Sequence, residues 1–244
     1  MSLAALTLGS VWGCGNGKDI AFDKDGFPGP ASSTFRGFFA SEGEVGQMAV
    51  AIAVSPSSLA PAWNAPGASV EATGSATPEI GAAVPLAGTY DTALDSLHLT
   101  GSSYEFSGHV AWRNGVPEAT GTFTSPGDDG AFAVALVTSY GPQIFCGQLL
   151  ATGDTQVGRL GYVISGVVIL GAACFSSDVE AVPLEGELDR TTTKPRLSMS
   201  GATVSRSVDL HGVMDEEAEL SAGSWTSTGT SGDASGTWGT ALCP

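Results

Sequence analysis

The stretches that decide the fold are V-P-L-A-G-T-Y-D at Val84–Asp91 and V-P-L-E-G-E-L-D at Val182–Asp189, which starts 98 residues later. Shorter matches follow at a similar spacing: L-H-L-T-G from Leu97 with L-S-M-S-G from Leu197, and A-T-G-T-F-T from Ala119 with S-A-G-S-W-T from Ser221. The spacing drifts slowly, as expected if turns between matched strands differ in length. The chain therefore contains one structural unit twice.

The clearest strand signal is the alternation in Tyr104–Arg113. Large or apolar residues occupy every second position, and polar residues occupy most of the positions between them. This pattern predicts a half-buried antiparallel strand, with Phe106, Val110 and Trp112 inside and Glu105, His109 and Arg113 outside. Asn114 and Gly115 then predict a tight hairpin turn into a return strand at 118–124. A further strand is expected at Ala234–Leu242.

No segment keeps a helical period, whereas period-two alternation is widespread. The predicted fold class is all-β: an internally duplicated antiparallel β-meander of six or seven strands per unit, in two tandem barrel- or sandwich-like units packed together. The units are placed at 35–140 and 145–243. Two separate barrels or sandwiches and one larger pseudo-symmetric structure both remain open. The uncharged run 160–175 is too short to span a membrane as a helix and is predicted to be a buried core strand.

The charge balance excludes several classes of function. Nine Lys and Arg residues face 25 Asp and Glu residues in a chain of 244, a formal charge of −16. Such a field repels phosphate groups, so nucleic-acid binding and attachment to a membrane through a basic patch are both disfavoured. We expect membrane association only through a lipid anchor.

The N-terminus predicts export. An apolar stretch, 3–13, ends in V-W-G-C at Cys14, and this junction resembles a bacterial lipoprotein processing site. The resemblance implies a signal segment at 1–14, lipidation of Cys14 and an extracytoplasmic protein. The Gly- and Pro-rich residues 15–34 then predict a tether. A first β-strand or a tag remnant is the alternative interpretation of the first residues.

Four cysteines behind an export-like start indicate an oxidising compartment. If Cys14 carries a lipid, three cysteines remain and only one disulfide can form. Cys146 precedes the second unit and Cys243 ends it, so a bond between them would tie its first and last strands. Cys174 lies in an apolar setting that suits a buried free thiol, although pairings that involve it stay open.

The sequence contains few signs of a catalytic site. His98, His109 and His211 fall at solvent-facing strand positions, and the sequence has no H-x-H, H-E-x-x-H, C-x-x-C or G-x-S-x-G pattern. The paired acids Asp128–Asp129 and 215–217 fall in predicted turns. We therefore expect no catalytic residue, no metal site and no cofactor.

The tryptophans suggest the alternative function. Trp112, Trp225 and Trp238 fall at strand positions, and S-G-T-W-G around Trp238 resembles the G-x-W element of lipocalin and avidin-like barrels. In lipocalins that element lies on the first strand, and here it lies on the last. The resemblance implies a carrier of a small hydrophobic ligand on a calycin-like barrel, with the three tryptophans lining its interior.

The sequence thus predicts a non-enzymatic structural or interaction module, lipid-anchored at the cell envelope or secreted, whose partner is an unidentified envelope or surface protein. The hydrophobic-ligand carrier is the alternative, and an enzymatic barrel with scattered acids is a third hypothesis. An empty interior lined by Trp and Phe would favour the carrier. A filled core would favour the module.

Overall fold

The computed structural model describes residues 33–53, 68–113, 116–138, 141–178, 180–230 and 232–243. Every regular element in these ranges is a β-strand. The predicted signal segment with Cys14, the tether as far as residue 32 and the predicted turn at Asn114 and Gly115 lie outside the described residues. Ser33 and the following residue, assigned to the tether from the sequence, begin the first strand instead.

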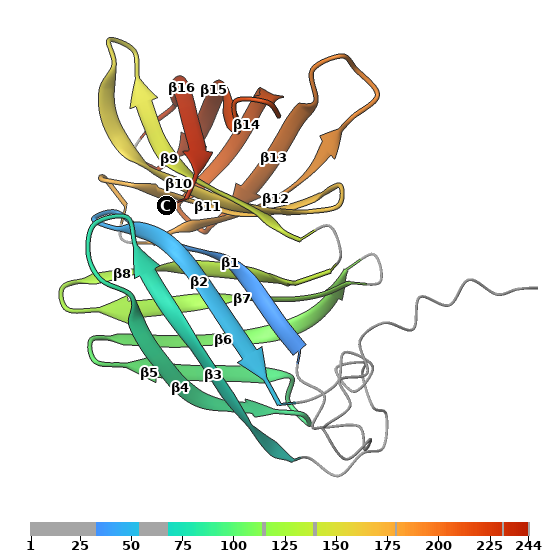
Figure 1. Ribbon diagram of the computed structural model, residues 1–244. Helices are drawn as coiled ribbons and strands as arrows, with labels where there is room; N and C mark the ends of the chain where they lie inside the picture. The colour runs from blue at the N-terminus through green and yellow to red at the C-terminus, as the bar shows by residue number, and fades with distance from the viewer. Residues whose placement is uncertain are drawn as a thin grey trace, which may run out of the picture.

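The first repeat forms a closed barrel of eight antiparallel strands, coloured blue to green in Figure 1. Its strands are β1 (Ser33–Ser41), β2 (Val45–Ile52), β3 (Ser69–Pro78), β4 (Val84–Asp91), β5 (Ser96–Gly101), β6 (Tyr104–Arg113), β7 (Val116–Ser125) and β8 (Asp128–Leu136). Each strand pairs with the next, and β8 pairs with β1 to close the sheet.

The second repeat forms a second closed barrel with the same strand order. Its strands are β9 (Gln143–Ala151), β10 (Thr155–Ser165), β11 (Val168–Phe175), β12 (Val182–Asp189), β13 (Arg196–Ala202), β14 (Arg206–Asp215), β15 (Leu220–Gly229) and β16 (Ala234–Leu242). Here β16 pairs with β9. The all-β, duplicated, tandem-barrel prediction is confirmed.

The strand count of six or seven per unit was too low. Strand β3 illustrates the cause, because its fully buried inward residues, Ala72 and Ala76, are small. A strand without large apolar side chains lacks the sequence signal that alternation provides. The run 160–175 also needs correction, since it is the end of β10 and all of β11, joined by a turn at Gly166 with φ of +64°. Positive φ at this position favours glycine.

The repeats match strand by strand. Leu97 and Leu197 lie on the fifth strands, and Gly121 and Gly223 lie on the seventh. Gly121 pairs across the sheet with Gly108, as Gly223 pairs with Gly212.

In each barrel an aromatic ring occupies the space above this glycine pair. A Cβ on Gly121 would lie 2.8 Å from the Phe132 ring, and a Cβ on Gly212 would overlap the indole of Trp238. Phe132 and Trp238 hold equivalent positions on β8 and β16. The glycines are therefore present in both repeats because the rings need their space.

Both barrel interiors are filled by side chains. In the first barrel five aromatic residues make ring contacts with centroids 5.3 to 6.2 Å apart: Phe39, Tyr104, Phe106, Phe123 and Phe132. In the second, Phe145 stacks on Tyr162, and Phe175 contacts Trp225. An eight-stranded barrel is just wide enough for side chains to fill or for one small ligand. Here large aromatic side chains take up that width.

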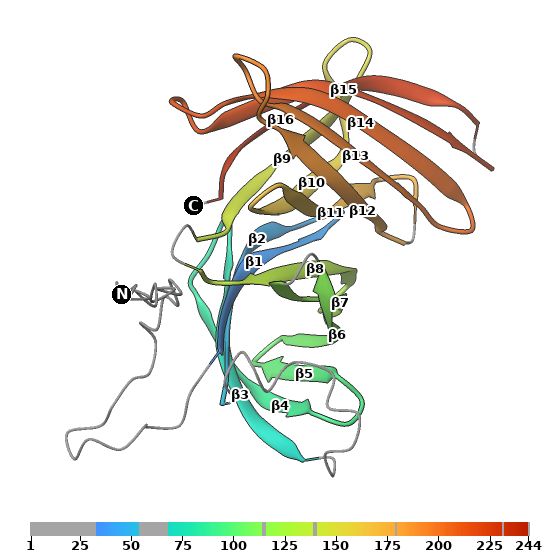
Figure 2. The same cartoon turned by 90° about the vertical axis from the view of Figure 1, so that its right-hand side faces the viewer.

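The barrels are stacked with their outer faces in contact (Figure 2). Apolar residues that point away from both interiors form a shared buried cluster, which includes Phe38, Ala40, Ala133 and Ala135 from the first barrel and Val163, Leu170, Ala172 and Cys174 from the second. Strands β1, β8, β10 and β11 are therefore covered on both faces, and this explains their nearly continuous apolar sequences. The Phe38 ring lies over Gly161. A Cβ on Gly161 would overlap this ring.

Polar contacts surround this apolar junction. The Gln47 side chain donates a hydrogen bond to the Cys243 carbonyl at 2.7 Å. Arg113 on β6 makes a bidentate salt bridge to Glu185 on β12, with both N–O distances 2.6 Å. The Arg159 guanidinium on β10 lies 2.9 Å from the Glu79 carboxylate, which follows β3. The two barrels are thus joined by an apolar centre and by polar contacts around it.

Candidate functional site: the groove between the barrels

The three tryptophans do not line a common cavity. Trp225 and Trp238 are buried in the second barrel, and their indole N–H groups donate to backbone carbonyls at 3.1 Å. Trp112 was expected inside the first barrel, but it is 37% exposed. It is the penultimate residue of β6, at the rim of the barrel. The predicted aromatic lining is therefore divided between a packed core and a rim.

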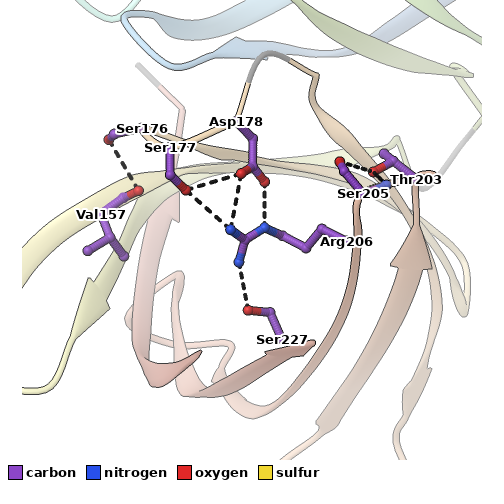
Figure 3. A network of polar contacts seen from close by, with 8 residues as sticks. All are labelled: Val157, Ser176, Ser177, Asp178, Thr203, Ser205, Arg206 and Ser227. Atoms are coloured by element: carbon purple, nitrogen blue, oxygen red, sulfur yellow. Dashed lines mark hydrogen bonds and ion pairs between the residues drawn. The ribbon is translucent and has the colours of Figure 1, made fainter. Parts of the chain in front are cut away.

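The mouth of the second barrel is occupied by a charged network (Figure 3). Arg206, only 6% exposed, donates to Asp178 Oδ1 at 3.0 Å and to Ser227 Oγ at 2.8 Å, and it lies 4.6 Å from the centre of the Phe175 ring. A hollow of about 430 Å³ at this mouth reaches Trp225. Arg206 and Trp225 both line this hollow.

The cysteines occupy three different settings. Cys14 lies outside the described residues. Cys146 and Cys243 form a disulfide, which ties the first strand of the second barrel to the residue after its last strand. Cys174 is a free, buried thiol in the junction. Burial, with a smaller contribution from Asp128, raises the pKa of Cys174 to about 12, so the thiol stays protonated and has little nucleophilic character.

The three histidines are exposed; His98 and His109 lie on the neighbouring strands β5 and β6, and His211 lies on β14 of the second barrel. His98 Nδ1 lies 3.1 Å from Ser107 Oγ on the neighbouring strand. At the equivalent place in the second barrel the partners are exchanged, with Ser198 Oγ 3.2 Å from His211 Nδ1. Such cross-strand pairs stabilise a sheet. Within the described ranges, His, Cys, Asp and Glu side chains form no group of three or more arranged to hold a metal ion.

A groove of about 490 Å³ runs along one side of the junction. Its first wall is the outer face of β7 and β8, and its second wall is the outer face of β11, β12 and the connection between them. The hydroxyl-bearing part of the first wall is a row on β7, namely Thr120, Thr122 and Thr124. The apolar part of the two walls consists of Ala131, Ala133, Leu170, Ala181 and Pro183.

The groove continues past Asp129 and Glu180 into a second hollow of about 550 Å³, with which it shares these two residues and Ala181. That hollow adds three more acids, Glu42, Asp128 and Asp178. Arg113, at the opposite end, is the basic residue among those described that line the groove, and it is already bound to Glu185. Asp178 is paired with Arg206, whereas Asp129, Glu180 and Glu42 make no salt bridge among the described residues, so negative charge remains at this end of the groove.

A buried carboxyl lies at the Arg113 end. Glu118 precedes the threonine row on the same face of β7 and is only 1% exposed. Its Oε2 lies 3.6 Å from Arg113 Nε and has no hydrogen-bond partner among the described residues. Burial raises the pKa of Glu118 to about 7, an effect that Arg113 opposes and Glu185 reinforces. Two carboxyl groups thus share one guanidinium where the barrels meet.

Sequence reasoning did not find this groove. Its walls are outward-facing residues of two repeats, and they become neighbours only when the barrels stack. The one available signal was the pair of continuous apolar stretches at β8 and β10–β11, which indicate strands covered on both faces.

No family model, no curated protein and no solved structure matches this chain. The described residues include no helix that is long and apolar enough to cross a membrane. The candidate site is therefore defined by its geometry and charge.

Proposed function

We propose that this protein is a non-enzymatic interaction module of the bacterial cell envelope, exported and held at a membrane by a lipid on Cys14. The observation that carries the proposal is the apolar junction that fuses two filled barrels into one body. Such a body offers its outer surfaces, and above all the groove, to a partner. The Cys146–Cys243 disulfide supports an oxidising compartment.

The packing favours this module over a hydrophobic-ligand carrier. A carrier needs an apolar interior that a ligand can enter. In both barrels the inward positions are taken by rings in mutual contact, and Arg206 with Asp178 occupies one mouth of the second barrel. The groove, by contrast, is an open concave surface with both apolar and polar walls.

The proposed membrane localisation is tested by cell fractionation. Native and Cys14→Ala forms expressed in a bacterial host should differ, with the native protein in the membrane fraction and the variant released or retained as precursor. Identical fractionation of both forms, each with an intact N-terminus, would remove the lipid anchor from the proposal.

The interaction role is tested by cross-linking in intact cells. A reproducible adduct with one envelope protein, linked through residues on the outer strand faces, is the expected result. If cross-links are confined to copies of the chain itself, the module has no heterologous partner and the proposal fails.

A further inference from the structure

The groove between the barrels has the charge and spacing of a peptide site. We propose that it binds an extended segment of a partner protein in which small or medium apolar side chains are followed by lysine or arginine. This inference rests on the proposed function as an interaction module and names the chemistry of its partner.

The shape of the groove favours an extended ligand. Thr120, Thr122 and Thr124 are alternate residues of one strand, so their hydroxyls repeat at about 6.7 Å. Alternate residues of an extended peptide have the same repeat, and each hydroxyl can donate to or accept from a peptide group. Because both sheets are closed, the described strands offer no free edge for strand addition. A partner must therefore dock through the side chains of the groove.

The apolar part of the groove fits modest side chains. Ala131 and Ala133 on the first barrel face Leu170 and Pro183 on the second. The two small alanine side chains leave space in the groove for a ligand. The larger side chains opposite them provide apolar contact area. Valine- or leucine-sized side chains on one face of an extended segment can enter this space.

The charge selects a basic ligand. Asp129 contributes from the first barrel and Glu180 from the second, where the groove opens into the acidic hollow. Neither carboxylate makes a salt bridge within the part of the chain that the structure describes, and the same holds for Glu42. An acidic ligand would meet these groups, while the Arg113 guanidinium is already bound to Glu185. A basic residue placed after the apolar ones would lie between Asp129 and Glu180.

Fluorescence anisotropy with a labelled peptide tests the proposal on the whole protein. The probe is Ser-Val-Ala-Val-Lys-Gly-Lys, and the two control peptides replace both lysines by glutamate or both valines by serine. We expect saturable binding of the probe that weakens as NaCl rises, because surface charge interactions are screened. Both control peptides should bind at least about tenfold more weakly.

Matched protein variants locate the site. The double variant Asp129→Asn with Glu180→Gln should weaken probe binding about tenfold. Glu71→Gln with Glu105→Gln removes the same charge from exposed positions outside the groove and should change binding less than about twofold. Thr122→Arg should abolish binding, because the arginine side chain would fill the groove and its charge would repel the lysines of the probe. Thr100→Arg on β5, outside the groove, should not affect binding. Circular dichroism and melting curves confirm that each variant folds.

Several results would overturn the proposal: no saturable binding of the probe, equal binding of the glutamate peptide, or equal losses in the groove and control variants. Competition by spermidine at the same concentration as the peptide would assign the groove to simple polycations instead. If the probe peptide does not bind but a reproducible cross-link to an envelope protein forms at another surface, the peptide ligand is rejected and the proposed interaction module is retained. Absence of both would reject the module as well.

Discussion

At the scale of single residues, Glu118 is a carboxyl group that the fold holds away from water. It is buried beside Arg113, which also binds Glu185. A carboxyl whose pKa is raised in the folded state binds a proton more tightly there than in the unfolded chain. The unfolding free energy should therefore decrease as the pH rises from about 4.5 to about 7.

Replacing Glu118 by glutamine should remove this pH dependence. Gln has the shape of the protonated acid, so the variant should match the parent at pH 5. At pH 8 it should be more stable by about 1–3 kcal/mol, since the parent must then bury a charge. Urea unfolding at both pH values measures the difference. Glu105→Gln on the exposed face of β6 is the control and should stay within about 0.5 kcal/mol at each pH. A parallel pH profile for parent and Glu118→Gln would contradict this account of the site.

The tryptophans should differ in their contribution to stability. Trp238→Ala removes a buried ring that covers a glycine pair and should cost about 3–5 kcal/mol. Trp112→Ala, at the exposed rim, should cost less than half as much. Thermal unfolding of the two variants is the measurement. Comparable losses would place Trp112 in the core after all.

At the scale of elements, the disulfide reinforces the closure of the second barrel. It links residues 97 positions apart and adjoins the β9–β16 ladder. Cys146→Ala with Cys243→Ala should lower the unfolding free energy by up to about 4.7 kcal/mol, the chain-entropy value for a loop of about 100 residues.

Chemical denaturation monitored by tryptophan fluorescence measures this change, since Trp225 and Trp238 both lie in the second barrel. Cys174→Ala leaves the disulfide intact and should cost far less. An unchanged midpoint in the double variant would mean that the strand ladder alone closes the barrel.

The elements themselves were partly predictable. Strand β6 was delimited correctly because Tyr104, Phe106 and Val110 alternate with polar residues, and β16 was delimited correctly as well. Strand β3 has small alanine residues in the middle of its buried face, and so its alternation pattern is weak. The turn at Gly166 was missed because the apolar residues around it continue without interruption.

The site was less predictable than the fold. The Cys146–Cys243 pairing could be suggested because both residues lie at the ends of one repeat. The groove could not, since Thr122 and Glu180 become neighbours only through the stacking of two barrels, and neither residue is unusual in its own strand. Trp112 was misplaced because alternation gives the face of a strand but not the greater exposure of residues near the end of that strand.

At the scale of the whole molecule, the central claim is that the two barrels form one rigid body with a groove of fixed shape. Closed sheets usually expose their outer faces, yet here β1, β8, β10 and β11 bury theirs against one another. Apolar burial of this kind, with the Arg113–Glu185 and Arg159–Glu79 salt bridges around it, should prevent independent motion of the barrels.

The distance between spin labels on the two barrels tests this claim most directly. Labels at Thr100→Cys on β5 and Thr226→Cys on β15 occupy exposed positions on strands outside the junction. Pulsed electron spin resonance should give a single narrow distance distribution, which Phe38→Asp in the junction should broaden. A broad or multiple distribution in the otherwise unaltered protein would contradict the account, because the barrels would then move independently and the groove would have no fixed shape.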